Sequence, residues 1–380
     1  MNDSWASDLP ARLAGRVDDA VFGPLEPLLK RRLDRCAQLA LLAARQAWAL
    51  ASPHRQDVDP ARVAVVIGTG IGGLATLERQ HLSLLNAGPS RVNPLTVPML
   101  IPNAAAGQIA IDLGLQGGAH TPVSACASGA EALLLAQLLL QDNRVDIVLA
   151  GGTEAPVNRL GLVGFAAMRA LSCRNHDPEQ ASRPYGRDRD GFVLSEGAGV
   201  LVLQRQQDLV SNGPAPLGWL QACGSSSDGH HIVAPEPEGR MASRAITDAL
   251  ERADLQAGDL SFVQAHATGT AVGDLAEARA LRLGLGAASD SLPVTAPKGQ
   301  LGHLLGAAGA VETILALQAL RKGVLPRSVN ADPLDPMIDL RVVTSGPLQL
   351  ADPSGSGGER YALKNAFGFG GHNISLVLAA

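Results

Sequence analysis

The stretch 123–130, with the sequence VSACASGA, places a cysteine among small residues between two apolar segments. This pattern is typical of a turn that joins a strand to a helix, and the run 131–140 that follows is dense in alanine and leucine. A helix beginning near Cys126 would point its unpaired N–H groups and positive dipole end at the sulfur, which favours the thiolate. The stretch therefore predicts a nucleophile at Cys126, although a cysteine buried only for packing fits it equally well.

Strand-like and helix-like segments alternate along the chain, which predicts an α/β fold. The segment 25–50 has the apolar stripe of one long helix. Further along, we expect strands at 62–67, 145–150 and 199–203, with helices at 131–140, 160–171 and 304–320.

A proline-containing segment at 211–216 separates two such alternating patterns. We therefore expect an N-terminal half at 1–214, which contains Cys126, and a C-terminal half at 215–380. The length of 380 residues, 46% of them hydrophobic, is sufficient for a large core in one or two domains.

Charge and cysteine usage exclude several classes of protein. The net charge of −5 argues against a nucleic-acid-binding protein, and no apolar run approaches the roughly 20 residues of a membrane span. The cysteines lie far apart, which argues against a disulfide framework or a zinc site; they are Cys36, Cys126, Cys173 and Cys223. We therefore expect no metal, and a location in a reducing compartment, the cytoplasm.

A glycine-rich segment, GTGIGG at 68–73, follows the expected strand at 62–67 and matches the pattern of a dinucleotide-binding turn. A dinucleotide-binding site of this type also needs an acidic residue about 20 positions further on, which contacts the ribose. The segment 90–107 contains none. The glycines are better explained by a tight backbone turn beside another group.

The second half supplies polar groups that a cysteine nucleophile could use. His266 follows an apolar strand in FVQAHATGT at 262–270, and Lys298 and His303 lie in PKGQLGH at 297–303. A lone histidine is more often structural than catalytic. The glycine-rich NAFGFGGHN at 365–373 precedes a terminal strand, and it could be a mobile loop or an anion-binding nest.

Together these motifs resemble those of the condensing enzymes of the thiolase fold, specifically the β-ketoacyl-[acyl carrier protein] synthases of types I and II, and most of all type II. The match runs in the family's order from about residue 5 to the C-terminus. The resemblance implies a thiolase-like fold, with two pseudo-repeated α/β halves in a layered αβαβα arrangement. It also implies an acyltransferase that performs the decarboxylative Claisen condensation of fatty acid elongation.

The resemblance implies a Cys-His-His site. Cys126 would carry the acyl chain, and His266 and His303 would stabilise the enolate formed from malonyl carrier protein. Lys298 would tune the charge of the histidines. Phe369 would gate the site, and its backbone N–H would form an oxyanion hole with that of Cys126.

Further roles come from the same resemblance. No cofactor is implied, since the substrates are carried on the phosphopantetheine of acyl carrier protein, and the protein is expected to be a homodimer. The expected substrate-binding residues are Thr268 and Thr270 for the phosphopantetheine arm, Gly70, Ile71 and Phe165 for the acyl pocket, and Glu312 as a partner of Lys298. The expected docking residues for the acidic carrier protein are Arg31, Arg32, Arg91 and Arg169.

Three other functions share part of this sequence pattern. A non-catalytic partner subunit resembling a chain length factor would lack the cysteine, so Cys126 argues against it. A thiolase would need a second catalytic cysteine near the C-terminus, but none lies beyond Cys223. A ketosynthase of a type II polyketide or polyene pathway stays open.

The beginning of the chain departs from the family. Relatives have a strand and a glycine turn ahead of the segment aligned with Trp5, and this chain lacks that element. The resemblance implies that the first strand lies inside the N-terminal sheet, so its absence would leave buried backbone groups unpaired, at about 1–3 kcal/mol each. We therefore expect a fuller product with about 30 to 40 more residues, the usual size of such a unit.

Overall fold

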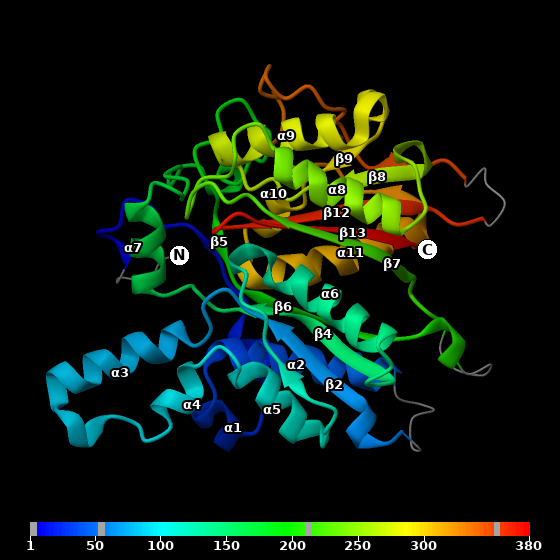
Figure 1. The fold of residues 1–380 in the computed structure, drawn as a ribbon. Helices are drawn as coiled ribbons and strands as arrows, with labels where there is room; N and C mark the ends of the chain where they lie inside the picture. Colours follow the sequence, from blue (N-terminus) through cyan, green and yellow to red (C-terminus); the bar gives the residue numbers. More distant parts are fainter. Residues whose placement is uncertain (1–5, 52–57, 210–214, 353–357) are drawn as a thin grey trace.

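Two β-sheets lie one above the other in the computed structural model, which describes residues 6–51, 58–209, 215–352 and 358–380 (Figure 1). Helices α6 (Ser128–Gln141) and α11 (Ala308–Lys322) lie between the sheets and contact strands of both. Small residues permit this close packing, since a Cβ on Gly129 would lie 2.8 Å from the carbonyl oxygen of Gly306. Other helices cover the two outer faces, so the expected αβαβα layering is confirmed.

The N-terminal sheet has the strand order β3-β2-β4-β6. Its strands are β3 (Ala119–His120), β2 (Val63–Gly68), β4 (Ile147–Glu154) and β6 (Gly197–Gln204). Every residue of β2 is buried, as expected for a strand of a parallel sheet covered on both faces. Helices α2 (Arg35–Ala51) and α5 (Ala104–Leu113) cover the outer face.

The C-terminal sheet repeats this pattern and has one more strand, in the order β7-β13-β12-β8-β9. Its strands are β7 (Trp219–Ser227), β13 (His372–Ala379), β12 (Tyr361–Gly368), β8 (Leu260–Gln264) and β9 (Val294–Thr295). The parallel β9, β8 and β12 correspond to β3, β2 and β4, and the antiparallel β13 corresponds to β6. Helix α8 (Arg240–Arg252) covers the outer face beside α9 (Ala271–Leu285).

The expectation that a strand is missing from inside the N-terminal sheet is wrong. Each neighbouring pair of its strands is hydrogen-bonded, so the described sheet has no internal gap. The extra strand of the C-terminal sheet, β7, pairs with β13 at the edge of the sheet. By the correspondence between the halves, the equivalent position lies beyond the edge strand β6.

Some predicted helices and turns also differ from the structure. The expected helix at 25–50 is divided into α1 (Pro27–Arg32) and α2, because the buried carboxylate of Asp34 accepts hydrogen bonds from the N–H of Cys36, at 2.9 Å, and from Thr76. The expected helix at 304–320 begins only at Ala308.

The C-terminal glycine segment is also more ordered than the sequence indicated. Residues 365–368 belong to strand β12, so only the tip of the segment forms a turn before β13. The connector at 211–216 lies largely outside the described residues.

The remaining described elements extend from this framework. Among the described helices, none is both long and apolar enough to cross a membrane. The other regular elements are α3 (Leu74–Ala87) and α4 (Thr96–Leu100), which form the arm at the lower left of Figure 1, α7 (Arg159–Ala167), α10 (Lys298–Leu301), the pair β1 (Ala14–Gly15) and β5 (Leu194–Ser195), and the pair β10 (Val324–Leu325) and β11 (Leu348–Gln349).

Candidate active site

Cys126 lies in a single 3-10 turn, Ala125–Ala127, directly before α6. Ala125 has a φ of 51°, a conformation that costs a non-glycine residue of the order of 1–3 kcal/mol and that is concentrated at functional sites. The hydroxyl of Ser128 holds the turn by accepting from Ser124 N, at 3.0 Å, and donating to Ala125 O, at 2.6 Å. The predicted turn before a helix is therefore present, with the sulfur at the helix N-terminus.

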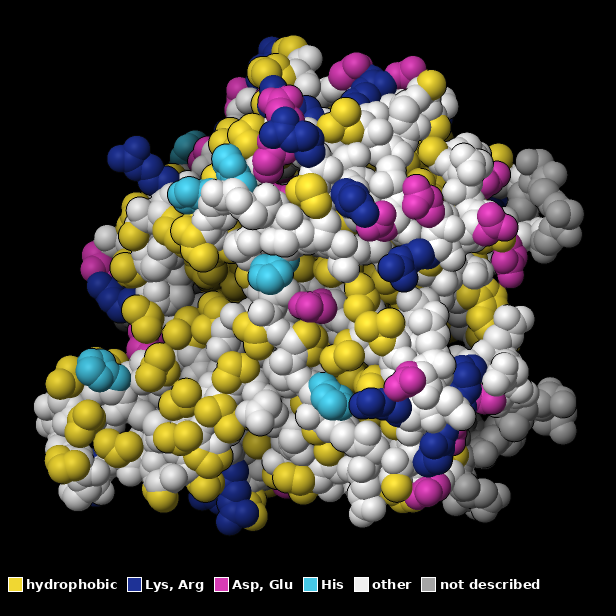
Figure 2. All heavy atoms as spheres, viewed as in Figure 1, with side chains coloured by type: hydrophobic (Ala, Val, Ile, Leu, Met, Phe, Trp, Pro, Cys, Tyr) yellow, Lys and Arg dark blue, Asp and Glu magenta, His cyan; other side chains and the backbone are white. Residues whose placement is uncertain are grey.

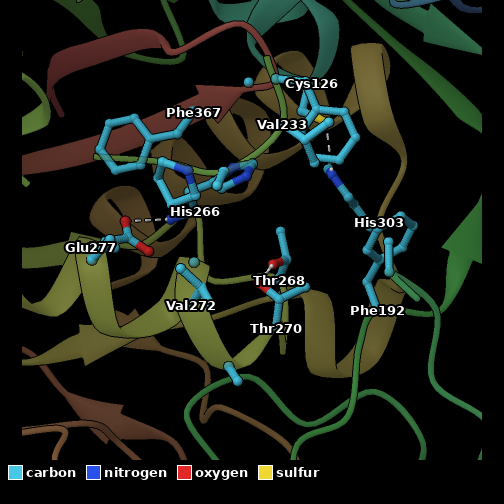
Figure 3. A pocket seen from close by; sticks show the side chains of 18 of the residues that line it. Cys126, Phe192, Val233, His266, Thr268, Thr270, Val272, Glu277, His303 and Phe367 are labelled. Atoms are coloured by element: carbon cyan, nitrogen blue, oxygen red, sulfur yellow. Dashed lines mark hydrogen bonds between the residues drawn. The ribbon is translucent and has the colours of Figure 1, made fainter. Parts of the chain in front are cut away.

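The imidazole of His303 meets this sulfur. Its Nε2 lies 3.1 Å from Cys126 Sγ (Figure 3). The backbone N–H of His303 donates to Val193 O, at 2.8 Å, and the ring of Phe192 packs edge-on against the imidazole with centroids 5.0 Å apart. The histidine is therefore held in one orientation, within hydrogen-bonding reach of the nucleophile.

Burial sets the protonation of this pair. It raises the pKa of Cys126 to about 12, against the opposing effects of the Lys298 charge and of backbone N–H groups, including that of Phe369. Burial also lowers the pKa of His303 well below its usual value, and the charge of Lys298 adds to this. These shifts favour a thiol and a neutral imidazole in the resting pair and so act against the expected thiolate, because desolvation disfavours the charged form of each group.

His266 lies beside His303, with ring centroids 5.5 Å apart and planes at 83°. Its backbone N–H donates to the buried carboxylate of Glu277, at 2.8 Å. Lys298 Nζ donates to His266 O, at 2.5 Å, and lies 3.5 Å from its Nδ1. Since an ammonium only donates, the contact with Nδ1 favours the tautomer of His266 that carries hydrogen on Nε2. Burial and Lys298 lower the pKa of His266 well below its usual value.

Behind the histidines, Lys298 is fully buried and pairs with Glu312 at 2.6 Å. A second buried lysine, Lys364 of β12, lies 3.2 Å from the other carboxylate oxygen. The expected pairing of Glu312 with Lys298 is confirmed, and its fully buried side chain does not line the cavity described next. The role of Lys364 was not predicted, although a lysine inside an otherwise apolar strand was a visible signal.

A cavity of about 390 Å³ opens in front of the cysteine and the histidines (Figure 3). The hydroxyl groups of Thr268 and Thr270 lie 3.0 Å apart at its wall. The predicted site residues that line the cavity are Cys126, His266, His303, Thr268, Thr270, Phe165, Phe369 and Arg169. The structure therefore brings together side chains from both halves that are far apart in the sequence.

Phe369 lies at the tip of the β12–β13 hairpin, between Gly368 and the left-handed Gly370, which has a φ of 86°. Its ring lies 6.5 Å from that of Phe165. The backbone N–H groups of Phe369 and Cys126 both interact with the cysteine sulfur. Both predicted oxyanion-hole donors therefore lie near the sulfur. Gly368 permits this approach, since a Cβ there would collide with the carbonyl of Ser124.

The glycine segment after β2 is held by a buried carboxylate. Glu154 Oε2 accepts from Gly70 N, at 2.6 Å, and from Gly306 N, at 3.0 Å, and Oε1 accepts from Thr69 Oγ1, at 2.9 Å. Burial raises the pKa of Glu154. Ile71 packs against the apolar cluster that contains Cys126. Gly70 and Ile71 therefore lie behind the nucleophile and do not line the open cavity.

The four predicted docking arginines lie in different places. Arg169 follows α7, is exposed, and lines the cavity. Arg31 and Arg32 are exposed on α1, and Arg91 is exposed after α3. These three do not line the cavity, so only Arg169 is at its mouth.

Two aromatic residues near the histidines were not singled out from the sequence. Phe192 packs on His303, and the ring of Phe367 lies 5.8 Å from that of His266. Among the described residues, no group of three or more His, Cys, Asp or Glu side chains could hold a metal ion. The chemistry available at this site is that of a thiol, two neutral imidazoles and backbone N–H groups.

Comparison with known proteins agrees with this geometry. The N-terminal domain of beta-ketoacyl synthases matches residues 7–209, and the C-terminal domain matches residues 217–332. The 3-oxoacyl-[acyl-carrier-protein] synthase 2 of Mycobacterium bovis is 41% identical over 371 residues, which cover 97% of this chain and 86% of that protein.

Two solved structures have the same fold. The ishigamide ketosynthase/chain length factor has a TM-score of 0.88 at 28% identity, covering 99% of this chain and 89% of that one. A ketosynthase structure with a type II polyketide acyl-carrier protein and a bound hexaketide has a TM-score of 0.85 at 28% identity, covering 91% of this chain and 85% of that one. The chain therefore has the thiolase-like fold and belongs to the β-ketoacyl synthase family.

Proposed function

We propose that this protein is a 3-oxoacyl-[acyl-carrier-protein] synthase, an acyltransferase that elongates fatty acyl chains by decarboxylative Claisen condensation. The observation that carries this proposal is the contact of 3.1 Å between Cys126 Sγ and His303 Nε2, with His266 beside it in one cavity. The relationship to 3-oxoacyl-[acyl-carrier-protein] synthase 2 over nearly the whole chain supports the same reaction.

The first step loads the acyl chain. His303 Nε2 takes the proton of Cys126, and the thiolate attacks the carbonyl carbon of the incoming thioester. The oxyanion of the tetrahedral intermediate lies between the backbone N–H groups of Cys126 and Phe369. When the intermediate collapses, the bond to the carrier thiolate breaks, and that thiolate takes the proton back from His303.

The second step forms the carbon–carbon bond. Malonyl carrier protein places its thioester oxygen where His266 and His303 donate Nε2–H groups, which for His303 requires that its hydrogen has moved from Nδ1 to Nε2 once Cys126 is acylated. Loss of CO₂ leaves its electron pair in an enolate, whose carbon attacks the acyl carbonyl on Cys126. A new C–C bond forms and the C–S bond to Cys126 breaks, leaving a thiolate that takes up one proton from the solvent, because loss of CO₂ from the malonyl carboxylate consumes one proton overall. The low pKa values of both histidines suit this step, since neutral imidazoles donate to the enolate without giving up their protons at once.

Acyl carrier protein is the proposed partner. One solved relative is an acyl-carrier protein in complex with its ketosynthase. Arg169, exposed at the mouth of the cavity, offers a positive charge to an acidic carrier. We propose that Arg31, Arg32 and Arg91 extend this docking surface, and that Thr268 and Thr270 hold the phosphopantetheine arm.

A homodimer is proposed from the surface. Exposed leucines gather on α3, in the lower left of Figure 2. An exposed apolar patch of this kind indicates a surface that contacts another protein. The edge strand β3 offers a second surface for a second copy, since β3 pairs with only one strand, β2, in the described sheet. The leucines are Leu77, Leu82, Leu84 and Leu85.

Two broader proposals have their own support. We propose that the halves divide at 214/215, which is supported by the two sheets of corresponding strand order. We also propose a cytoplasmic location, which is supported by four free cysteines.

A ketosynthase of a type II polyketide pathway is the second candidate function. It is favoured by the two solved structures of ketosynthases with TM-scores of 0.85 and 0.88. The two functions share every step at Cys126 and differ in the chain that is accepted and in the number of condensations that follow.

The test combines acyl carrier proteins of graded saturated chain length with malonyl carrier protein, and identifies products by mass spectrometry. We expect each saturated acyl chain that is accepted to gain two carbons as one 3-oxoacyl product, with Cys126→Ala inactive. Products with several successive keto groups would favour the polyketide function. No product from any chain length, with the wild-type protein folded, would contradict the proposal.

A further inference from the structure

Strand β12 carries a charged residue into the interior of the molecule. Lys364 is fully buried, and the buried apolar residues Leu363 and Ala366 lie one and two positions from it in the same strand. Its Nζ donates to Asn365 O, at 2.8 Å, and lies 3.2 Å from Glu312 Oε2. Burying an ammonium is costly unless a carboxylate compensates it. A buried lysine at this place therefore requires an explanation beyond packing.

Glu312 is shared between two lysines. Its Oε1 lies 2.6 Å from Lys298 Nζ, and its Oε2 lies 3.2 Å from Lys364 Nζ. Among the described residues, neither oxygen has a further hydrogen-bond partner. With both lysines protonated, the three side chains carry a net charge of about +1.

The nearby second carboxylate does not neutralise this charge by direct pairing. Glu277, on α9, accepts from the backbone N–H groups of His266 and Ala267, at 2.8 and 2.7 Å. It also accepts from Asn365 Nδ2, at 3.2 Å. Its oxygens are therefore occupied by neutral donors, and among the described residues Lys364 forms its ion pair with Glu312.

We propose that Lys364 is a positioning residue for the condensing reaction: it offsets the charge of Glu312, so that the positive charge of Lys298 acts on the two histidines. A single Lys–Glu pair would be neutral and would exert little field on its surroundings, whereas the pair plus a second ammonium is positive. This inference rests on the proposed roles of His266 and His303 as neutral donors.

The charged groups around the histidines are consistent with this role. After burial, the charge of Lys298 is the largest cause that lowers the pKa of both His266 and His303, and Lys364 lowers both further. Burial also lowers the pKa of Lys364 itself to about 8, against the opposing effect of Glu312. Lys364 therefore keeps its charge at neutral pH and loses it above about pH 8. The groups that face it are Lys298 on α10, Glu312 on α11, Glu277 on α9, and His266 and His303 beyond the strand ends.

The test is Lys364→Met, which keeps the length of the side chain and removes its charge. Two readouts are followed against pH: malonyl carrier protein decarboxylation, and modification of His266 and His303 by diethyl pyrocarbonate, which requires neutral imidazole. Removal of the positive charge raises the histidine pKa values. The acid limb of both profiles, where the signal falls as the histidines become protonated, should therefore shift to higher pH by about one unit. Lys322→Met, an exposed lysine near the end of α11, is the matched control and should leave both limbs in place.

A charge-restoring double variant separates this role from packing. Lys364→Met combined with Glu312→Gln has a net charge of about +1 again, from Lys298 alone. The acid limb should therefore return toward its wild-type position. If Lys364 only filled space, Lys364→Met would not move the acid limb, and there would be no shift for Glu312→Gln to reverse.

Each outcome can be interpreted. If folded Lys364→Met leaves the histidine modification profile unchanged, or if the double variant does not restore it, the inference is wrong. If Lys364→Met does not fold, Glu312→Gln is compared with the double variant, and the acid limb must lie at higher pH in the double variant. The modification profile needs no turnover, so wild-type protein that fails to decarboxylate malonyl carrier protein contradicts the proposed function instead.

Discussion

Cys126 Sγ and His303 Nε2 lie 3.1 Å apart, yet burial raises the pKa of the thiol to about 12 and lowers that of the imidazole. The pair is therefore neutral at rest, and the thiolate forms only as the proton moves to His303 during attack. This differs from a cysteine that is already ionised by its surroundings.

Alkylation of Cys126 by iodoacetamide tests this resting state. Because the pKa is near 12, the alkylation rate should keep rising about tenfold for each pH unit between about pH 8 and pH 10, without levelling. The measurement uses a Cys173→Ser background, which removes the exposed thiol. A plateau reached below pH 8 would show a stabilised thiolate and contradict this account.

The two histidines should differ in what they affect. His303→Ala should slow both acylation of Cys126 by a thioester and malonyl decarboxylation, the latter by about 10²–10⁴-fold, because His303 contacts the sulfur and faces the enolate. His266→Ala should slow decarboxylation and leave acylation close to the wild-type rate. Equal loss of both activities in the two variants, together with a lowered melting temperature, would favour a structural role for the histidines.

Arg169 should act on the carrier and not on the acyl group. Arg169→Glu should raise KM for acyl carrier protein substrate by about tenfold, because a positive charge at the cavity mouth becomes negative. KM for the small thioester acyl-CoA should change little. Arg321→Glu, an exposed arginine on α11, serves as the charge-matched control. An equal rise in KM for both substrates would count against a docking role.

Glu154 should matter for stability. Glu154→Gln keeps the shape but turns an amide N–H₂ toward the donors of Thr69 or of Gly70 and Gly306. Each buried donor left unpaired costs about 1–3 kcal/mol, so the free energy of unfolding should fall by at least that amount. Urea titration measures it, with the exposed Glu251→Gln on α8 as control. Equal stability of the two variants would contradict the described network.

Local patterns in the sequence were sufficient for much of the fold. The buried run at 62–67, the alanine-rich helix after Cys126 and the strand before His266 are each confirmed within a few residues. The break before α2 was not predicted: Asp34, which lies between the two helices, accepts hydrogen bonds from Thr76, a residue of another element. A tertiary contact of this kind leaves no local signal in the sequence.

Features of the site that depend on how deeply a side chain is buried were also not predicted. The position of Cys126 before a helix was evident, but the depth at which the sulfur is buried, and hence its raised pKa, follows only from the packing of both halves. Similarly, Lys364 was visible in an apolar strand, but its partner Glu312 comes from α11 across the middle layer. Sequence therefore indicates which residues are chemically capable, while their protonation is determined by the assembled environment.

The most direct test of the central claim is to map the acyl group. Wild-type protein and Cys126→Ala are each incubated with acyl carrier protein substrate, and the adduct is located by intact and peptide mass spectrometry. We predict one acyl group on the wild-type protein, on the peptide that contains Cys126, and none on the variant. An acyl group found on Cys36, Cys173 or Cys223, or an equal adduct on Cys126→Ala, would contradict the assignment of Cys126 as the nucleophile.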